Sequence, residues 1–292
     1  MRLLLLGNTG QLGWELERSL CPLGEITAVD FPDLDMSNPE NIRRWVQEVE
    51  PAVIVNATAY TNVDKAEEQP ELAMAINGTG PGVLAEEARL HQAALIHFST
   101  DYVFDGRETQ PYREEDQPNP LGMYGRSKLE GERAVEAIDD SFLIFRTAWV
   151  YSLRRPSFVT KVLEWSRRQQ TLRVVTDQVS NPTWCRSLAE ATASLLARAG
   201  RNPAAWIQER KGLYHLAGWG YASRIDLAKA VLRCDPAAEE QVTEKLEPAL
   251  SREFPSPVER PLFSALNCEK FEQTFDLRLP DWEKALKLAM VS

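Results

Sequence analysis

The chain has 292 residues, enough for one large domain or two of ordinary size. Its 33 basic and 43 acidic side chains give a net charge of -10, which disfavours binding to a nucleic acid polymer or to an anionic membrane. With 43% hydrophobic and 26% charged residues, the composition is that of an ordinary globular protein.

Cysteine spacing and the N-terminal segment predict the compartment. No two cysteines form a C-x-x-C pair, so they are interpreted as buried thiols in a reducing environment. The apolar run at residues 3–6 is too short for a signal peptide or a membrane span. We therefore expect a cytoplasmic protein. The widely spaced histidines predict no histidine-rich metal site, and the four cysteines are Cys21, Cys185, Cys234 and Cys268.

The first half alternates short apolar runs with segments of helical period, which is typical of a parallel sheet with crossover helices. The expected fold is α/β, a Rossmann-type doubly wound parallel sheet. Strands are predicted at Leu3–Leu6, Ile26–Val29, Ala52–Asn56, Ala94–Phe98 and Phe142–Arg146. Helices are predicted at Gln11–Leu20, Pro39–Val49, Pro70–Leu90 and Tyr124–Ala137.

The pattern loosens after Ala148, which predicts a smaller α/β lobe. We expect residues 1–150 to bind a dinucleotide and residues 151–292 to form mainly a substrate-binding lobe, with some elements returning to the main sheet. Pro248 to Pro261 is proline-rich and is predicted to be a loop. The expected elements here are helices at 157–169, 188–198, 223–233 and 282–290, and strands at 172–175 and 213–216.

A glycine-rich turn follows the first strand and opens the first helix, in the order Gly7-Asn8-Thr9-Gly10-Gln11-Leu12-Gly13. Glycine permits a tight turn, and the amides of the helix N-terminus then face a pyrophosphate. Asp30 ends the second strand, where a carboxylate can bind ribose hydroxyls, and Asp35 with Met36 follows as a candidate adenine contact. Together these features predict a dinucleotide site, and the acid at position 30 favours NADH. Each residue alone also suits an ordinary turn or helix cap.

Tyr124 and Lys128 are four residues apart and therefore share one face of the expected helix. A cation beside a phenol favours the phenolate, so this pair suits a proton donor whose pKa is lowered toward neutrality. A hydroxyl pair, Ser99-Thr100, stands where the fourth strand delivers side chains to the carboxyl edge of the sheet. The alternatives are a surface lysine beside a half-buried tyrosine, and hydroxyls that satisfy strand-end backbone groups.

These motifs resemble those of the extended short-chain dehydrogenase/reductases, and more narrowly of the dTDP-4-dehydrorhamnose reductases. The resemblance covers nearly the whole chain. It is carried by the segments at residues 7–16, 53–67, 99–104, 124–128 and 145–151, and in the second half by those at 181–183, 212–216, 260–261, 266–267 and 270–271. The block from Asn56 to Glu67 is typical of this subfamily.

The resemblance implies reduction of the 4-keto group of a dTDP-6-deoxyhexulose by NADPH or NADH, giving dTDP-L-rhamnose. It implies that Tyr124 donates the proton, that Lys128 holds the nicotinamide ribose, and that Thr100 binds the carbonyl oxygen. Because the family accepts either cofactor, the resemblance weakens the preference for NADH that Asp30 suggests. It further implies a cofactor-lining segment at Ala59, Tyr60 and Thr61, and sugar nucleotide contacts at Asp101 and Trp149. Arg260 is a candidate partner for the diphosphate.

Several alternatives stay open. Related dehydratases carry a glutamate where this chain has Tyr102, so the sequence favours direct reduction over dehydration. A sugar-nucleotide 4-epimerase shares the tyrosine–lysine pair. A non-catalytic binding subunit, like the regulatory subunit of methionine adenosyltransferase, is a second class. Some family members use Mg²⁺ at a dimer contact; Glu15 is a candidate ligand but suits a helix surface better. No metal site is assigned, and the chain is expected to be a monomer or a homodimer.

Overall fold

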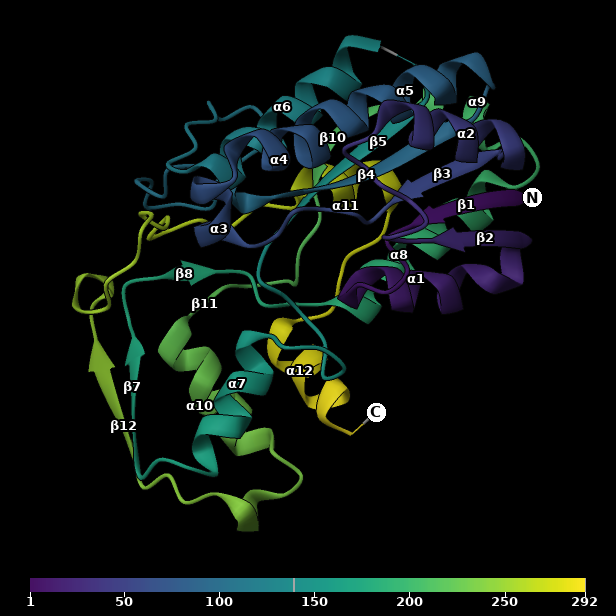
Figure 1. Cartoon of the computed structure of the whole chain (residues 1–292). Coiled ribbons are helices and arrows are strands. Elements are labelled where there is room, and N and C mark those ends of the chain that lie inside the picture. Colours follow the sequence, from purple (N-terminus) through teal and green to yellow (C-terminus); the bar gives the residue numbers. More distant parts are fainter. Residues whose placement is uncertain (139, 292) are drawn as a thin grey trace.

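The computed structural model describes residues 1–138 and 140–291 (Figure 1). Six parallel strands form the central sheet, in the order β10-β5-β4-β3-β1-β2. β1 lies between β2 and β3, so the strand order reverses there, and ligands bind at the carboxyl ends of such strands. The predicted fold class is confirmed. The strands are β1 Arg2–Leu6, β2 Glu25–Val29, β3 Val53–Asn56, β4 Ala94–Thr100, β5 Phe142–Thr147 and β10 Gly212–His215.

Helices cover both faces of the sheet, which explains its continuous apolar strands. Along β1 the side chains alternate between two cores, with Leu3 and Leu5 in one, Leu4 and Leu6 in the other, and all four fully buried. The helices of one face are α2 Pro39–Val49, α5 Gly80–Leu90 and α6 Met123–Ile138. Those contributing to the other are α1 Gln11–Leu20, α8 Cys185–Ala199, α9 Pro203–Gln208 and α11 Glu269–Phe275.

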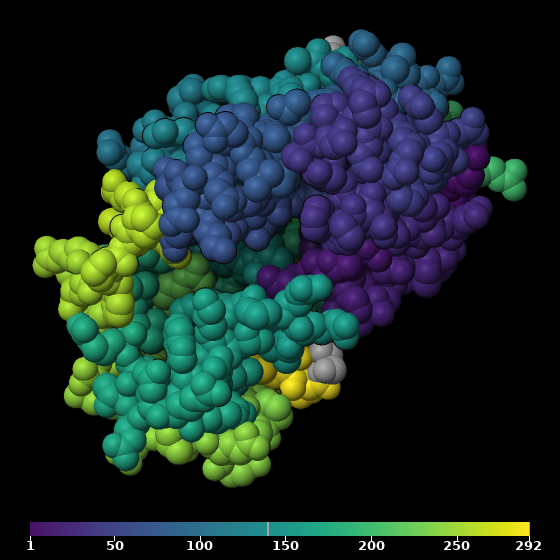
Figure 2. Space-filling view, in the orientation of Figure 1, coloured from purple at the N-terminus to yellow at the C-terminus, as the bar shows by residue number. Residues whose placement is uncertain are grey.

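A second lobe lies beside the sheet, with a hollow between the two in the space-filling view (Figure 2). Its core joins α7 Phe158–Ser166, α10 Arg224–Cys234 and α12 Trp282–Met290 to the strand β7 Thr171–Val175. β7 pairs in parallel with β12 Lys245–Ala249. Two short pairs complete the lobe, β6 Val150–Tyr151 with β9 Thr183–Trp184, and β8 Val179–Ser180 with β11 Ala222–Ser223.

The chain crosses between the lobes several times. It leaves the sheet after β5, and β9 leads directly into α8, which returns to pack beside α1. β10 then adds to the sheet edge beside β5, and α11 packs near β10. The division at residue 150 stays a prediction, and α8, α9, β10 and α11 all come from beyond it.

The helix predicted at Pro70–Leu90 is wrong in one respect. It is interrupted by a π-helical turn at Ala75–Thr79, between α4 Pro70–Met74 and α5. Asn77 is the physical cause, because its side chain accepts a hydrogen bond from Tyr60 N at 2.8 Å and donates one to Ser127 Oγ at 3.0 Å. These tertiary contacts compete with regular helix geometry.

Other departures from the sequence prediction are local. The proline tract begins inside β12, where Pro248 is paired with Val174 in a two-stranded sheet that tolerates a missing amide hydrogen. Cys21 is exposed, contrary to the expected burial, because the chain turns at Cys21–Leu23 after α1. The helix α3 Val63–Glu68, capped by Asn62, was not predicted. In the described part of the chain, no helix is long and apolar enough to span a membrane.

Candidate functional site

The glycine turn is tightly packed against the helix that it opens. Gly7 has a positive φ of 87°, and Gly10 N donates to Gly7 O at 3.1 Å. A Cβ built on Gly13 would lie only 2.0 Å from Gly7 O, so α1 can approach the turn this closely only with glycine there. A Cβ on Gly7 would meet the backbone of Ala57 and Thr58 at 3.0 Å.

A cleft of about 680 Å³ runs from this turn along the carboxyl ends of β1, β3 and β4 to α6. It brings together most of the residues singled out in the sequence. The expected residues that line it are Gly7, Gly10, Gln11, Leu12, Asp30, Asp35, Met36, Ala59, Thr61, Thr100, Asp101, Tyr124, Lys128 and Trp149. Gly13 and Tyr60 do not line it: Gly13 lies beneath the turn, and the Tyr60 hydroxyl donates to Gln69 Oε1 at 2.8 Å.

Two acidic side chains lie at the β2 end of the cleft, and each has local partners. Asp30 Oδ2 accepts hydrogen bonds from Thr9 N at 3.1 Å and from Thr9 Oγ1 at 2.5 Å. Asp35 Oδ1 accepts from Ser37 N and Oγ. Asp30 therefore ties the glycine turn to β2, and the exposed ring of Phe31 follows it on the cleft wall.

Tyr124 lies at the start of α6, facing the end of β4. A Cβ on Gly125 would meet Tyr102 O at 2.1 Å, so glycine lets α6 begin close to this strand end. Burial raises the pKa of the Tyr124 phenol, and a hydrogen bond with Thr100 opposes that rise. The lowering of the Tyr124 pKa expected from Lys128 is therefore not found, because burial is the largest influence on this phenol and it acts in the opposite direction. A neutral phenol is the form that can donate a proton.

The neighbouring residue, Ser99, also lines the cleft, but its hydroxyl is hydrogen-bonded to a buried carboxylate. Its Oγ donates to Glu132 Oε1 at 2.5 Å, and Glu132 also pairs with Arg146 at 2.7 Å, all three being buried. Alternation along β4 gives the Thr100 hydroxyl other partners, and its Oγ1 donates to Asp101 Oδ1 at 3.2 Å. This buried ion pair fixes β4, β5 and α6 relative to one another.

Lys128 is almost fully buried, with 1% of its surface exposed. Its Nζ donates to Phe98 O at 2.6 Å and lies 3.3 Å from His97 Nε2. Burial lowers the pKa of Lys128 to about 8, and the carboxylate of Glu132 opposes that shift. Lys128 is thus a buried residue of the cleft whose amine contacts the backbone of β4, and it is not a surface side chain.

Asp101 lines the cleft with little of its surface exposed, and it joins the two lobes. Its Oδ2 accepts hydrogen bonds from Ser264 Oγ at 2.5 Å and from Ser180 Oγ at 3.1 Å. Burial raises its pKa, and these hydrogen bonds oppose the rise. Because its carboxylate already has two serine partners, Asp101 holds the second lobe against the end of β4.

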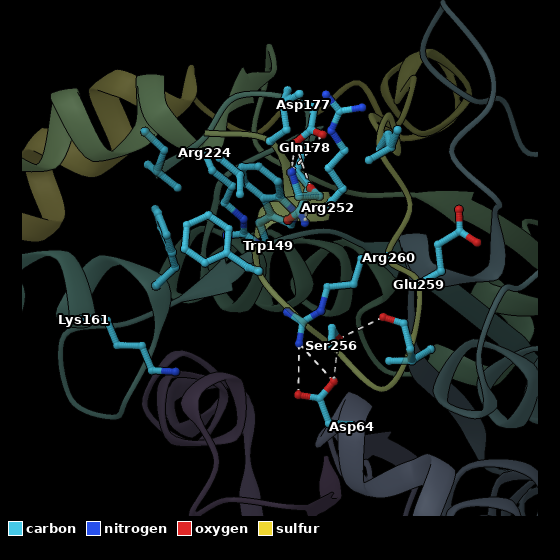
Figure 3. Close-up of a pocket in the computed structure, with 18 of the residues that line it drawn as sticks. Asp64, Trp149, Lys161, Asp177, Gln178, Arg224, Arg252, Ser256, Glu259 and Arg260 are labelled. Carbon is cyan, nitrogen blue, oxygen red and sulfur yellow. Dashed lines mark hydrogen bonds and ion pairs between the residues drawn. The ribbon is translucent and has the colours of Figure 1, made fainter. Parts of the chain in front are cut away.

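A larger cavity of about 1070 Å³ continues from the cleft into the second lobe (Figure 3). Trp149 and Arg224 line both spaces and so lie at their junction. The Arg224 guanidinium stacks on the Trp149 ring, 3.5 Å from its centre, and on Phe158 at 4.8 Å. Arg260 lies in this cavity and not in the cleft, with its Nη2 3.2 Å from both carboxylate oxygens of Asp64.

Arg224 is the main site residue that sequence reasoning missed. It follows the N-cap Ser223 at the start of α10, where the helix dipole disfavours a cation. An arginine at this unfavourable position is the local sequence signal that could have indicated an anion-binding residue. Burial lowers its pKa to about 10, and the charges of Tyr102 and Asp101 oppose the shift. Lys161 and Arg252 of the same cavity were also missed.

Among residues 1–138 and 140–291, no group of three or more His, Cys, Asp or Glu side chains is arranged to hold a metal ion. Glu15 is not the helix-surface residue that was expected. It is 5% exposed, and its Oε2 accepts from Arg186 Nε at 3.2 Å, which joins α1 to α8. Glu15 therefore has a structural partner.

Comparison with known proteins identifies the family. The RmlD substrate binding domain matches residues 1–292. The dTDP-4-dehydrorhamnose reductase of Salmonella typhimurium is 41% identical, covering 98% of this chain and 96% of the relative. The chain belongs to the dTDP-4-dehydrorhamnose reductase family. The Escherichia coli K12 member is 40% identical with the same coverage.

Solved structures of the dTDP-4-dehydrorhamnose reductase family agree in fold. The protein from Clostridium acetobutylicum has a TM-score of 0.90 and 34% identity, covering 100% of this chain and 99% of its own. The Bacillus anthracis protein, solved in complex with NADP, has a TM-score of 0.89 and 30% identity, covering 99% and 98%. The UDP-glucose 4-epimerase of Thermus thermophilus, at 19% identity and a TM-score of 0.80, shares the fold.

Proposed function

We propose that this protein reduces the 4-keto group of dTDP-4-dehydro-L-rhamnose to give dTDP-L-rhamnose, using NADPH or NADH. The observation that carries the proposal is the meeting of Thr100, Tyr124 and Lys128 at one end of the glycine-turn cleft, where it opens into a cavity bearing Arg224. Residues 1–150 are then the cofactor-binding domain and residues 151–292 mainly the substrate lobe.

The cleft suits a dinucleotide. The glycine turn lines the cleft and opens α1 there, and a pyrophosphate is stabilised by the backbone amides of a helix N-terminus. Asp30 is positioned by Thr9 to accept from ribose hydroxyls, and Phe31 offers an aromatic face. When bound, a nicotinamide cofactor supplies the hydride. Gln11, Leu12, Asp35, Met36, Ala59 and Thr61 complete the proposed cofactor contacts.

Tyr124 is proposed to give its proton to the substrate oxygen. Its raised pKa keeps the phenol protonated over the working pH range, and its hydrogen bond with Thr100 orients it. Thr100 and Tyr124 together can donate hydrogen bonds to an oxygen that gains negative charge, which stabilises the transition state. Lys128 is proposed to bind the nicotinamide ribose.

The cavity of the second lobe is proposed to hold the dTDP moiety. A diphosphate needs cationic partners, and Arg224 and Arg260 face this space from α10 and from the proline tract. Binding at Arg260 would replace its ion pair with Asp64. Trp149 lies between the cavity and the cleft, where it can contact the sugar, and Asp101 supports this junction from below.

A reductase assay tests the proposal. The wild-type protein, mixed with dTDP-4-dehydrorhamnose and NADPH or NADH, should oxidise one cofactor per sugar reduced, whereas a 4-epimerase would release no oxidised cofactor. Tyr124→Phe should lower kcat by about 100-fold or more while leaving cofactor binding intact. Normal turnover by this variant would contradict the mechanism.

If the wild-type protein bound the cofactor without any turnover, the result would favour a non-catalytic binding subunit. The GDP-linked sugar is the control for base specificity.

The remaining expectations concern the assembly and its setting. A monomer or homodimer in the cytoplasm stays a prediction, as does the absence of nucleic acid polymers and membranes among its partners. A role for Mg²⁺ is left unassigned. Gel filtration with and without Mg²⁺ would test both the oligomeric state and metal dependence.

A further inference from the structure

A chain of hydrogen bonds connects Lys128 to the buried side chains of the two central strands β3 and β4. Asn56 and His97 are register partners on β3 and β4, both fully buried. Asn56 Oδ1 accepts from Thr58 N at 3.0 Å and from Thr58 Oγ1 at 2.5 Å. Asn56 Nδ2 lies 3.1 Å from His97 Nδ1, and His97 Nε2 lies 3.3 Å from Lys128 Nζ. The proposed mechanism does not use Asn56 or His97.

The direction of these hydrogen bonds is determined by the backbone. Because Asn56 Oδ1 faces the amide hydrogen of Thr58, the Asn56 Nδ2 must be the group that donates to His97 Nδ1. A neutral imidazole then carries its hydrogen on Nε2, facing Lys128. An ammonium has three hydrogens and no lone pair, so it cannot accept from that N–H, whereas a neutral amine can.

His97 is held neutral by its surroundings. Burial lowers its pKa well below the ordinary value, and the ammonium form of Lys128 lowers it further. The neighbouring backbone positions add no charge, since His97 is paired with Asn56 on β3 and Ile144 on β5, and the π-helical turn presents Asn77. The charged group that acts on Lys128 is Glu132, which favours the ammonium from the same helix and is itself paired with Arg146 of β5 at 2.7 Å.

We propose that His97, oriented by Asn56, is a positioning residue that favours the neutral amine of Lys128, so that Lys128 takes up a proton from solvent when the cofactor binds. The inference rests on the proposed cofactor role of Lys128. On binding, the amine turns from His97 Nε2–H to the ribose hydroxyl oxygens, gains one proton and becomes an ammonium. Cofactor affinity is then linked to pH through this single nitrogen.

Proton uptake on cofactor binding tests this directly. NADPH is added to the full-length protein at pH 8.5 in weak buffer with a pH indicator, where the 2′-phosphate is already ionised. The wild type should take up about half a proton or more per bound cofactor. Tyr124 adds nothing, because its raised pKa keeps it protonated. His97→Gln, whose side-chain carbonyl accepts from an ammonium, should take up less than half of the wild-type amount.

Two further variants make the test specific. Asn56→Asp keeps the acceptor for Thr58 but accepts from His97 Nδ1–H, which frees Nε2 to accept from the ammonium, so it should also reduce uptake. His215→Gln removes a second buried histidine that contacts backbone oxygens of Tyr112 and Asn267 instead of Lys128, and should leave uptake unchanged.

The outcomes separate the two proposals. Wild-type uptake near zero, or unchanged uptake in His97→Gln or Asn56→Asp, would overturn the inference while leaving the reductase proposal standing. Failure of the wild type to bind NADPH or NADH would instead contradict the proposed function. As an independent readout, the pH above which NADPH affinity falls should move upward by one unit or more in both variants.

Discussion

Arg224 is a candidate substrate-binding residue in addition to Thr100, Tyr124 and Lys128. Its guanidinium stacks on Trp149 and reaches both the cleft and the larger cavity. Lysine keeps the charge but loses the planar stack, and methionine loses both. We expect Arg224→Lys to raise the KM for the sugar nucleotide about tenfold and Arg224→Met about 100-fold, with NADPH affinity nearly unchanged.

The control for Arg224 is Arg252→Met, an exposed arginine of the same cavity, which should change the KM by less than threefold or so. Steady-state kinetics with both substrates varied would check these values. Equal effects of the two methionine variants would argue against a specific role for the stacked guanidinium.

Sequence reasoning at this scale succeeded where spacing within one element carried the signal. Tyr124 and Lys128 are four apart on a helix, and Thr100 ends a strand, so their meeting was predictable. Arg224 and His97 could not be found in this way, because their partners are distant in sequence. The pKa of Tyr124 was predicted in the wrong direction, since burial is invisible in the spacing of charges.

At the level of elements, the glycine turn and α1 form one unit whose geometry depends on Gly13. We expect Gly13→Ala to abolish cofactor binding or prevent folding, because its Cβ would meet backbone atoms that cannot move aside. Gly200→Ala is the matched control. It makes the same substitution at a glycine with φ 64°, where no atom lies within 4 Å of the added Cβ.

The control variant should therefore lose only about 1 kcal/mol of unfolding free energy, the cost of left-handed backbone without glycine. Urea unfolding and NADPH titration of both variants would check this. Wild-type affinity in Gly13→Ala would show that α1 has freedom to move away from the turn.

Elements of the first half were predictable because strand and helix alternate with clear periodicity. The failures came where tertiary contacts override local preference, as at the π-helical turn, where Asn77 bonds Tyr60 and Ser127. The strand β12 was hidden by Pro248, which a central strand would exclude but an edge strand accepts.

For the whole molecule, the acidic net charge of -10 is compatible with an anionic sugar nucleotide because the cationic groups are placed at the cavity. Arg224, Arg252 and Arg260 line it, and Arg260 forms an ion pair with Asp64. The two lobes are joined at the junction by Asp101 and by Gln11, whose Oε1 accepts from Ser152 N at 2.7 Å. The composition favours a small-molecule partner, and the fold places these arginines at the cavity proposed to bind it.

The stability of the whole protein should fall in mild acid through its buried histidines. Burial lowers the pKa of His215 from 6.5 to about 3, so between these values the unfolded chain binds a proton that the native chain does not. The stability that neutral His215 contributes is present above pH 6.5 and is lost as pH falls toward 3.

Carboxyls such as Asp101, whose pKa burial raises, change stability in the opposite direction as pH falls. Comparing the wild type with His215→Gln therefore isolates the effect of the histidine. Between pH 7.5 and 5.5, the wild type should lose about 1 kcal/mol more unfolding free energy than His215→Gln. Urea unfolding of both proteins at the two pH values measures this difference, and equal losses would mean that His215 becomes protonated in the native state.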